Sequence, residues 1–176
     1  MSAITACPLP DESLLQTYRR SGGYTDCFAA DIARAVTHAQ FVEAFYTTNI
    51  FAVEQFLLGV FLSKPSNDAQ ARQLATGSID NFAAWRVEAR ASNQLLLTDF
   101  TGRTRSWLMV APHELSADTL TRLYFGSAVG AVTNRKTGGK SIGSAFHALL
   151  GFHKLYSRIL LSSARAKLQE IGRAHV

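Results

Sequence analysis

The chain has 176 residues, a net charge of +5, 47% hydrophobic residues and 18% charged residues. This composition describes a globular protein and excludes a disordered one. One domain is expected at this length, with about 70% of the surface of the unfolded chain buried on folding.

The two cysteines, Cys7 and Cys27, are too few for a disulfide framework or for the ligands of a structural metal. The N-terminal sequence lacks the basic and apolar regions of a signal peptide, so we expect a reduced, cytoplasmic setting. The most apolar run, Phe41 to Leu62, is interrupted by Glu43 and Glu54, so we expect no membrane span.

Residues 1–22 contain two prolines and end in a glycine-rich turn signal. They are expected to form an N-terminal tail or a docking arm, before a single domain at residues 23–172. Tyr24 to Ile32 mixes polar and apolar residues in rough alternation, which predicts a first strand.

Short helices are expected next. Thr37 and Gln40 fit a capping box, which predicts a helix beginning at Thr37. Ile50 to Leu62 predicts a helix that is apolar nearly all round, so it would be buried on both faces or lie in a subunit interface. Asp68 can cap a third helix that ends at Gly77.

From about Phe82 the hydrophobic period changes to two, which indicates strands. Trp85, Val87 and Ala89 are expected on one face of the first of them. Short strands with tight connections predict an antiparallel meander. The expected strands are Trp85 to Arg90, Gln94 to Asp99, Thr104 to Ala111 and Thr121 to Thr133.

The stretch from Ser141 to Leu168 predicts one long amphipathic helix of about 40 Å. At about 100° per residue, one face carries Ile142, Ala145, Phe146, Leu149, His153, Tyr156, Leu160 and Ser163. The polar members His153, Tyr156 and Ser163 need partners when buried, so they face either satisfied core contacts or a cavity. No paired carboxylate lies on the same helix, so no acid–base dyad is predicted for His153.

Together these elements predict an α+β fold, with a curved antiparallel sheet wrapped around a long C-terminal helix and short helices after the first strand. This order resembles the helix-grip fold of the START and birch-pollen-allergen-like superfamily, which includes polyketide cyclases and lipid-transfer proteins. Phe146 to Arg158, with the Phe-His-basic-Leu run Phe152 to Leu155, is similar to the last helix of an uncharacterised bacterial branch of that superfamily. The resemblance implies the fold and an apolar binding cavity, and it carries over no catalytic residues.

Other motifs are weaker. Thr137 to Ser141 suggests a P-loop, but Asn134 stands where the first glycine is required, so we expect a basic turn with Ser141 as the N-cap of the helix. The five histidines show no metal-binding spacing and no G-x-S-x-G motif occurs, so we expect no metal and no cofactor.

The positive charge is concentrated in residues 135–176, which carry 8 basic residues and 1 acidic residue. A solvated helix face is the simplest interpretation, and a surface for an anionic membrane or nucleic acid is the alternative. We expect no nucleic-acid partner.

The function predicted is the binding of an apolar or lipid-like small molecule between the sheet and the C-terminal helix. An enzyme of cyclase or hydrolase type using the same cavity is one alternative, and a dimerising or membrane-surface module is another. The predicted ligand-binding residues are His153, Tyr156, Phe146, Leu149, Trp107 and Phe125. The expected partner is a hydrophobic small molecule, and a homodimer is possible.

Overall fold

The computed structural model describes residues 3–48, 68–113, 120–129, 132–133, 140–141 and 144–173. The helices are α1 (Gln16–Arg20), α2 (His38–Tyr46), α4 (Asp68–Thr76) and α5 (Ser144–Arg173). The strands are β1 (Thr5–Ala6), β2 (Tyr24–Ile32), β3 (Asn81–Phe82), β4 (Trp85–Ala91), β5 (Gln94–Asp99), β6 (Thr104–His113), β7 (Leu120–Val129), β8 (Val132–Thr133) and β9 (Lys140–Ser141). The predicted α+β fold class is confirmed.

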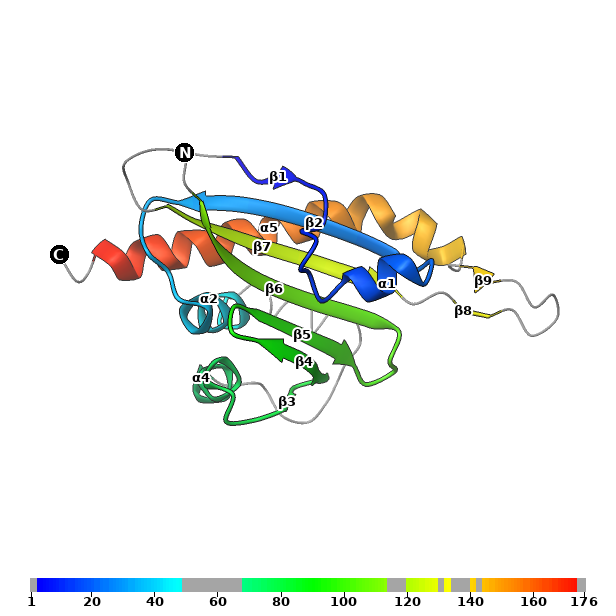
Figure 1. Cartoon of the computed structure of the whole chain (residues 1–176), viewed down its shortest axis with the longest axis horizontal. Helices are drawn as coiled ribbons and strands as arrows, with labels where there is room; N and C mark the ends of the chain where they lie inside the picture. The colour runs from blue at the N-terminus through cyan, green and yellow to red at the C-terminus, as the bar shows by residue number, and fades with distance from the viewer. Residues whose placement is uncertain are drawn as a thin grey trace.

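Seven strands form one antiparallel sheet in the order β1-β2-β7-β6-β5-β4-β3 (Figure 1). From β3 to β7 each strand pairs with the next one along the chain, which is the predicted meander. On its other side β7 pairs with β2, from Tyr24 opposite Val129 to Ile32 opposite Thr121. The sheet thereby places the first long strand next to the last one.

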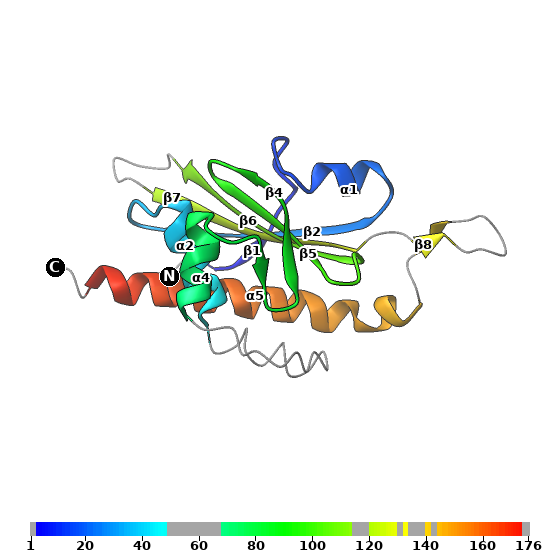
Figure 2. The same ribbon diagram turned by 90° about the horizontal axis from the view of Figure 1, so that it is seen from below.

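One face of the sheet is covered by helices. Figure 2 shows α5 running along this face, with α2 and α4 beside it, while α1 lies on the opposite face. Buried residues of α2, including Phe41 and Phe45, join Leu160, Leu161 and Leu168 of α5 in one hydrophobic core against the sheet. This is the helix-grip arrangement that the order of elements predicts.

The buried face of α5 is rotated from the predicted stripe. Burial is described for the side chains of α5 from His153 onward. The buried ones are Ser157, Leu160, Leu161, Ala164 and Leu168, whereas Ile159 is 41% exposed. Tyr156 and Ser163 therefore lie at the edge of the contact with the sheet rather than at its centre. The rotation follows from the sequence, since leucine and alanine at positions 161, 164 and 168 supply a wider apolar face than the stripe that ends at Ser163.

The opposite face of the sheet is covered by the N-terminal segment, so residues 3–22 form a docked arm rather than a free tail. Leu9 and Leu15 of the arm are buried against a second hydrophobic cluster that includes Trp107 and Met109. The side chain of Gln94 links the two layers, because its Oε1 accepts hydrogen bonds from Leu14 N at 3.0 Å and Trp107 Nε1 at 2.9 Å. Each face of the sheet therefore packs against its own hydrophobic cluster.

The prediction that Trp85, Val87 and Ala89 share one face of β4 is wrong, because the strand contains a β-bulge. Trp85 and Val87 pack into the core beside α5, but Ala89 packs into the cluster under the arm. The register of β4 against β5 shifts between Val87 and Ala89. One extra residue in a strand reverses the alternation of faces, which a uniform period of two cannot foresee.

Several local predictions are confirmed. Thr37 caps α2, with its side chain accepting from Gln40 N and the Gln40 side chain accepting from Thr37 N. Gly77 follows α4 with φ at +79°, a conformation that favours glycine at the end of a helix. Ser141 was expected to cap the last helix, but it lies in β9 and pairs with Val132, so the helix begins at Ser144 after a short hairpin.

The helix predicted at residues 50–62 and the basic turn at residues 134–139 lie outside the described residues. Among the helices that are described, none combines the length and the apolarity needed to cross a membrane. On α5, Lys154 and Arg158 are exposed as a solvated basic face requires, whereas Lys167 Nζ donates to Thr47 O at 3.1 Å.

Candidate functional site

A small cavity lies between the sheet and α5. Its volume is about 30 Å³, and side chains from β6, β7, α2 and α5 contribute to its wall. The lining residues are Phe45, Trp85, Thr104, Arg105, Ser106, Phe125, Ser127, His153, Tyr156 and Leu160. The cavity has room for one or two water molecules.

The wall of the cavity has two kinds of surface. Phe45, Trp85, Phe125 and Leu160 provide apolar surface. The hydroxyl groups of serine, threonine and tyrosine, together with the imidazole of His153, provide hydrogen-bonding groups. A few polar groups on an apolar wall are typical of binding sites for small molecules.

In the wall of the cavity, His153 of α5 meets a carboxylate from β2. Its Nε2 lies 3.1 Å from Asp26 Oδ2 and 2.7 Å from Ser127 Oγ. The side chain of Asp26 is 8% exposed and that of His153 is 25% exposed. The polar group that the helix presents to the sheet is therefore held by two polar groups on adjacent strands.

Asp26 is the centre of this cluster. Its Oδ1 accepts hydrogen bonds from Ser127 N at 2.9 Å and from Ser127 Oγ at 2.7 Å. Its Oδ2 accepts from the hydroxyl of Tyr24 at 3.2 Å, and the Tyr24 ring meets the His153 ring edge-on at 6.4 Å. Because Asp26 and Ser127 are opposite each other in the β2–β7 register, the sheet itself fixes the pair.

The surroundings favour an ionised Asp26. Burial raises the pKa of this carboxyl, but the hydrogen bond and charge of His153 and the two hydrogen bonds from Ser127 outweigh it and leave the pKa below its ordinary value. Burial, together with the charge of Asp26 and the hydrogen bond to it, raises the pKa of Tyr24. The cluster thus combines a carboxylate with a phenol that keeps its proton.

The cluster does not have the geometry of a Ser-His-Asp catalytic triad. In a triad the carboxylate holds one ring nitrogen while the other takes the proton of the serine hydroxyl. Here Asp26 and Ser127 both meet Nε2 of His153, and the Ser127 hydroxyl donates to Asp26. The arrangement holds the imidazole in place rather than activating Ser127 as a nucleophile.

Three of the predicted ligand-binding residues line the cavity, namely His153, Tyr156 and Phe125. The side chains of Phe146 and Leu149 lie outside the described ones. Trp107 was expected in the same site, but it is fully buried under the N-terminal arm on the opposite face of the sheet. Alternation along β6 places its neighbour Ser106 toward the cavity instead.

Sequence reasoning missed Asp26 and Ser127. A signal was present, because Asp26 has the same parity in β2 as Phe28, Ala30 and Ile32, which all face the core beside α5. A carboxylate in line with core residues must find a buried partner. Helical periodicity relates His153 only to residues of its own helix, so it carries no information about a carboxylate on a strand.

No group of three or more histidine, cysteine, aspartate or glutamate side chains in the described part of the chain could hold a metal ion. Comparisons of the chain with protein-family models, with curated proteins and with solved structures find no match. Function must therefore be inferred from the cavity and its side chains.

Proposed function

We propose that the protein binds a small amphipathic molecule between the sheet and α5, with the polar group of the molecule at His153 and Tyr156. The observation that carries this proposal is the cavity itself, where polar groups from two strands and one helix converge on an otherwise apolar wall. The helix-grip arrangement adds support, since the cavity is lined by residues of the sheet and of α5.

The residues that line the cavity suggest how such a molecule would bind. Its polar group would lie at His153, whose imidazole is held by Asp26 and Ser127 at the edge of the contact between α5 and the sheet. Its apolar part would lie against Phe45, Phe125 and Leu160. A pre-positioned imidazole loses little conformational freedom on binding, which favours affinity.

The small volume of the cavity limits the size of the molecule that can bind without a change in the structure. Pockets for drug-sized ligands typically measure about 300–1,000 Å³, and this cavity measures about 30 Å³. Binding an organic molecule therefore requires side chains of the wall to move. Trp85 lines the cavity and Trp107 does not, so ligand entry should change the fluorescence of Trp85 alone.

A thermal-shift and native mass-spectrometry screen tests the proposal. Carboxylic acids and alcohols of matched chain length are the probes, and the Trp107→Phe variant leaves Trp85 as the sole tryptophan, which is excited selectively at about 295 nm or above, beyond the absorption of tyrosine. At least one probe should raise Tm and change the fluorescence of Trp85. Tyr156→Phe and His153→Gln should each weaken its binding by about fivefold to tenfold, the loss of one hydrogen bond.

Lys154→Ala is the matched control, because Lys154 is an exposed residue of the same helix. It should leave affinity unchanged. If no probe shifts Tm, or if the control weakens binding as much as His153→Gln, the proposal fails.

An enzyme of hydrolase or cyclase type is the second candidate, because Asp26 pairs with His153 and a histidine held by a carboxylate can act in proton transfer. Hydrolysis of p-nitrophenyl acetate is a simple assay for the hydrolase form. His153→Ala should then lower kcat/KM by at least about 100-fold. Turnover that is absent, or that survives in both His153→Ala and Tyr156→Phe, removes this candidate.

A further inference from the structure

The first strand brings the two cysteines of the chain together, on the face of the sheet opposite the cavity. In the antiparallel β1–β2 pair Thr5 lies opposite Ala29 and Ala6 lies opposite Phe28. The next position places Cys7 opposite Cys27, and Cys7 N donates to Cys27 O at 3.0 Å. The two Sγ atoms are 3.4 Å apart.

This placement suits a disulfide without displacement of the backbone. Residues opposite each other on antiparallel strands have Cα atoms about 4.5–5.5 Å apart, within the range of about 4.4–6.8 Å found in disulfides. A bond of about 2.05 Å requires the two sulfur atoms to approach by about 1.4 Å. Small rotations of the two side chains supply that movement.

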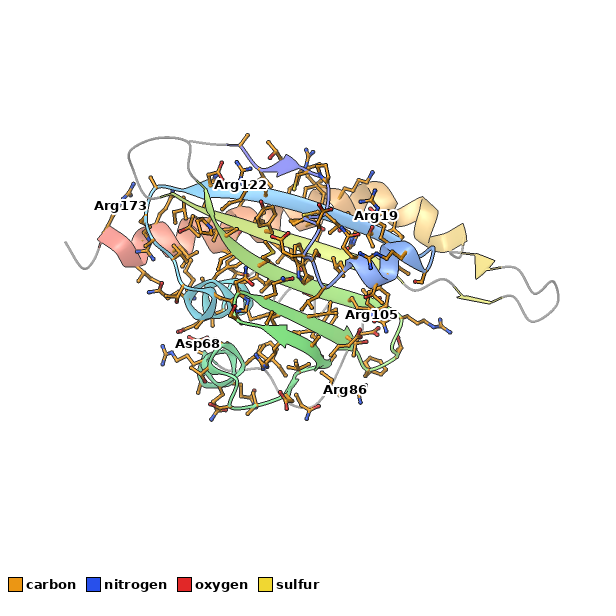
Figure 3. All side chains as sticks on the ribbon, in the orientation of Figure 1. Arg19, Asp68, Arg86, Arg105, Arg122 and Arg173 are labelled. Carbon is orange, nitrogen blue, oxygen red and sulfur yellow. The ribbon has the colours of Figure 1, made fainter. Side chains whose placement is uncertain are left out.

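The two thiols differ in reactivity. The hydrogen bond with Cys27 lowers the pKa of the Cys7 thiol by more than burial raises it, and the charge of Arg122 lowers it further. Figure 3 shows Arg122 at the β2 side of the sheet. The same hydrogen bond and burial raise the pKa of Cys27. Cys7 is half-buried and Cys27 is buried, so Cys7 is the thiol that a reagent meets first.

We propose that Cys7 and Cys27 form a reversible disulfide that fastens the N-terminal arm to β2, with a low-molecular-weight disulfide as the oxidant. The Cys7 thiolate attacks one sulfur of that molecule, forming a mixed disulfide and releasing one thiolate. Cys27 then loses its proton and attacks the Cys7 sulfur, releasing the second thiolate. The two cysteines are oxidised by two electrons, and the oxidant is reduced to two thiols.

The bond would act on the arm rather than on the cavity. Leu9 and Leu15 of the arm cover Trp107, and the non-covalent contacts of the arm are what hold it on the sheet. A covalent link at Cys7 closes a loop that contains α1, which restricts the unfolded chain more than the folded one. Oxidation should therefore stabilise the protein and keep the arm in place.

The test is to equilibrate the native protein with oxidised glutathione and with reduced glutathione, then to count thiols and map peptides. With the oxidised reagent we expect no free thiols, a mass lower by two hydrogen atoms and a peptide linking Cys7 to Cys27. Tm should rise by about 5–10 °C. Reduced glutathione should reverse all of these changes.

Single-cysteine variants test the order of the steps. Cys27→Ser should retain glutathione on Cys7, because no second thiol displaces it. Cys7→Ser should keep Cys27 reduced until the protein is denatured. Two free thiols in the oxidised native protein, a stable glutathione adduct on wild-type Cys7, or a link between two chains would each overturn the proposal.

Discussion

His153, on the last helix, lies with its Nε2 3.1 Å from Oδ2 of Asp26, on the first long strand. The contact joins the last helix to the first long strand, where α5 packs on β2 and β7. Ser127 and Tyr24 donate to the same carboxylate, so the contact is part of a polar cluster. Asp26 therefore fixes the position of His153, a residue of the cavity wall, within a helix–sheet contact that is otherwise largely apolar.

Asp26→Asn should destabilise the protein by about 2–3 kcal/mol, because it removes the charge from a buried carboxylate that accepts several hydrogen bonds. Asp31→Asn is the matched control on the same strand. Asp31 makes two hydrogen bonds with Arg122, at 2.7 and 2.9 Å, and its side chain is 22% exposed, more than that of Asp26, so Asp31→Asn should cost less, about 1 kcal/mol. Urea unfolding at pH 7 measures both values. Equal costs for the two variants would contradict the role given to Asp26.

The same carboxylate should produce an acid-sensitive component of stability. The folded pKa of Asp26 is below 3.8, the ordinary value for the side chain. The unfolded state therefore binds the proton more readily, so the stabilisation is complete above about pH 5 and is lost as pH falls through the folded pKa. Unfolding free energies measured between pH 2 and 5 should fall more steeply in wild type than in Asp26→Asn. Parallel curves for the two proteins would disprove the assignment.

The rotation of α5 predicts different costs for two leucines on that helix. Leu161 is fully buried against the sheet, whereas Leu155 is 58% exposed. Leu161→Ala should cost about 2–4 kcal/mol, since it leaves a cavity in the core. Leu155→Ala should cost less than about 0.5 kcal/mol. Chemical denaturation with matched m-values measures both, and similar costs would mean that the helix is packed on another face.

Much of the fold could be predicted from the sequence, because local signals determine it. The capping box of Thr37 and Gln40, the glycine after α4 and the alternation of faces along β6 and β7 each depend on neighbouring residues. Features that depend on tertiary packing could not be predicted in this way. The bulge at Val87 and the rotation of α5 arise from contacts with other layers.

The candidate site was predictable only in part. His153 and Tyr156 stood out as polar residues within an apolar stripe, and both line the cavity. Asp26 and Ser127 come from strands whose pairing brings distant parts of the chain together, and no short-range pattern specifies that pairing. Trp107 shows the opposite error, because an aromatic residue on a strand can belong to either face of a sheet that is covered on both sides.

Gly126→Ala should disturb the packing between the sheet and the arm. A Cβ atom at Gly126 would lie 2.7 Å from Asp26 O and 2.9 Å from both Leu15 Cδ1 and Trp107 Cε3. Overpacking of this kind costs about 1–3 kcal/mol. The near-ultraviolet circular dichroism of Trp107 should change with it. Gly102→Ala is the control, because its Cβ would meet open space and only the positive φ of +68° is strained. An unchanged tryptophan signal in Gly126→Ala would contradict the tight contact.

His38 should add a second pH dependence, at milder acidity. Burial lowers its pKa from 6.5 to about 4, against a hydrogen bond to the backbone of Leu108 and with a small contribution from the charge of Arg90. Its Nε2 is buried and has no hydrogen-bond partner among the described residues, so a proton there would be unpaired.

Because the folded pKa of His38 lies below the unfolded one, the unfolded state takes up the proton first as pH falls. Stability should therefore be complete above about pH 6.5 and should decrease by about 2–3 kcal/mol toward pH 4. His38→Gln should be less stable at pH 7 and should lack this slope. A wild-type curve that is flat between pH 6.5 and 4 would show that His38 is protonated as readily in the folded protein as in the unfolded chain.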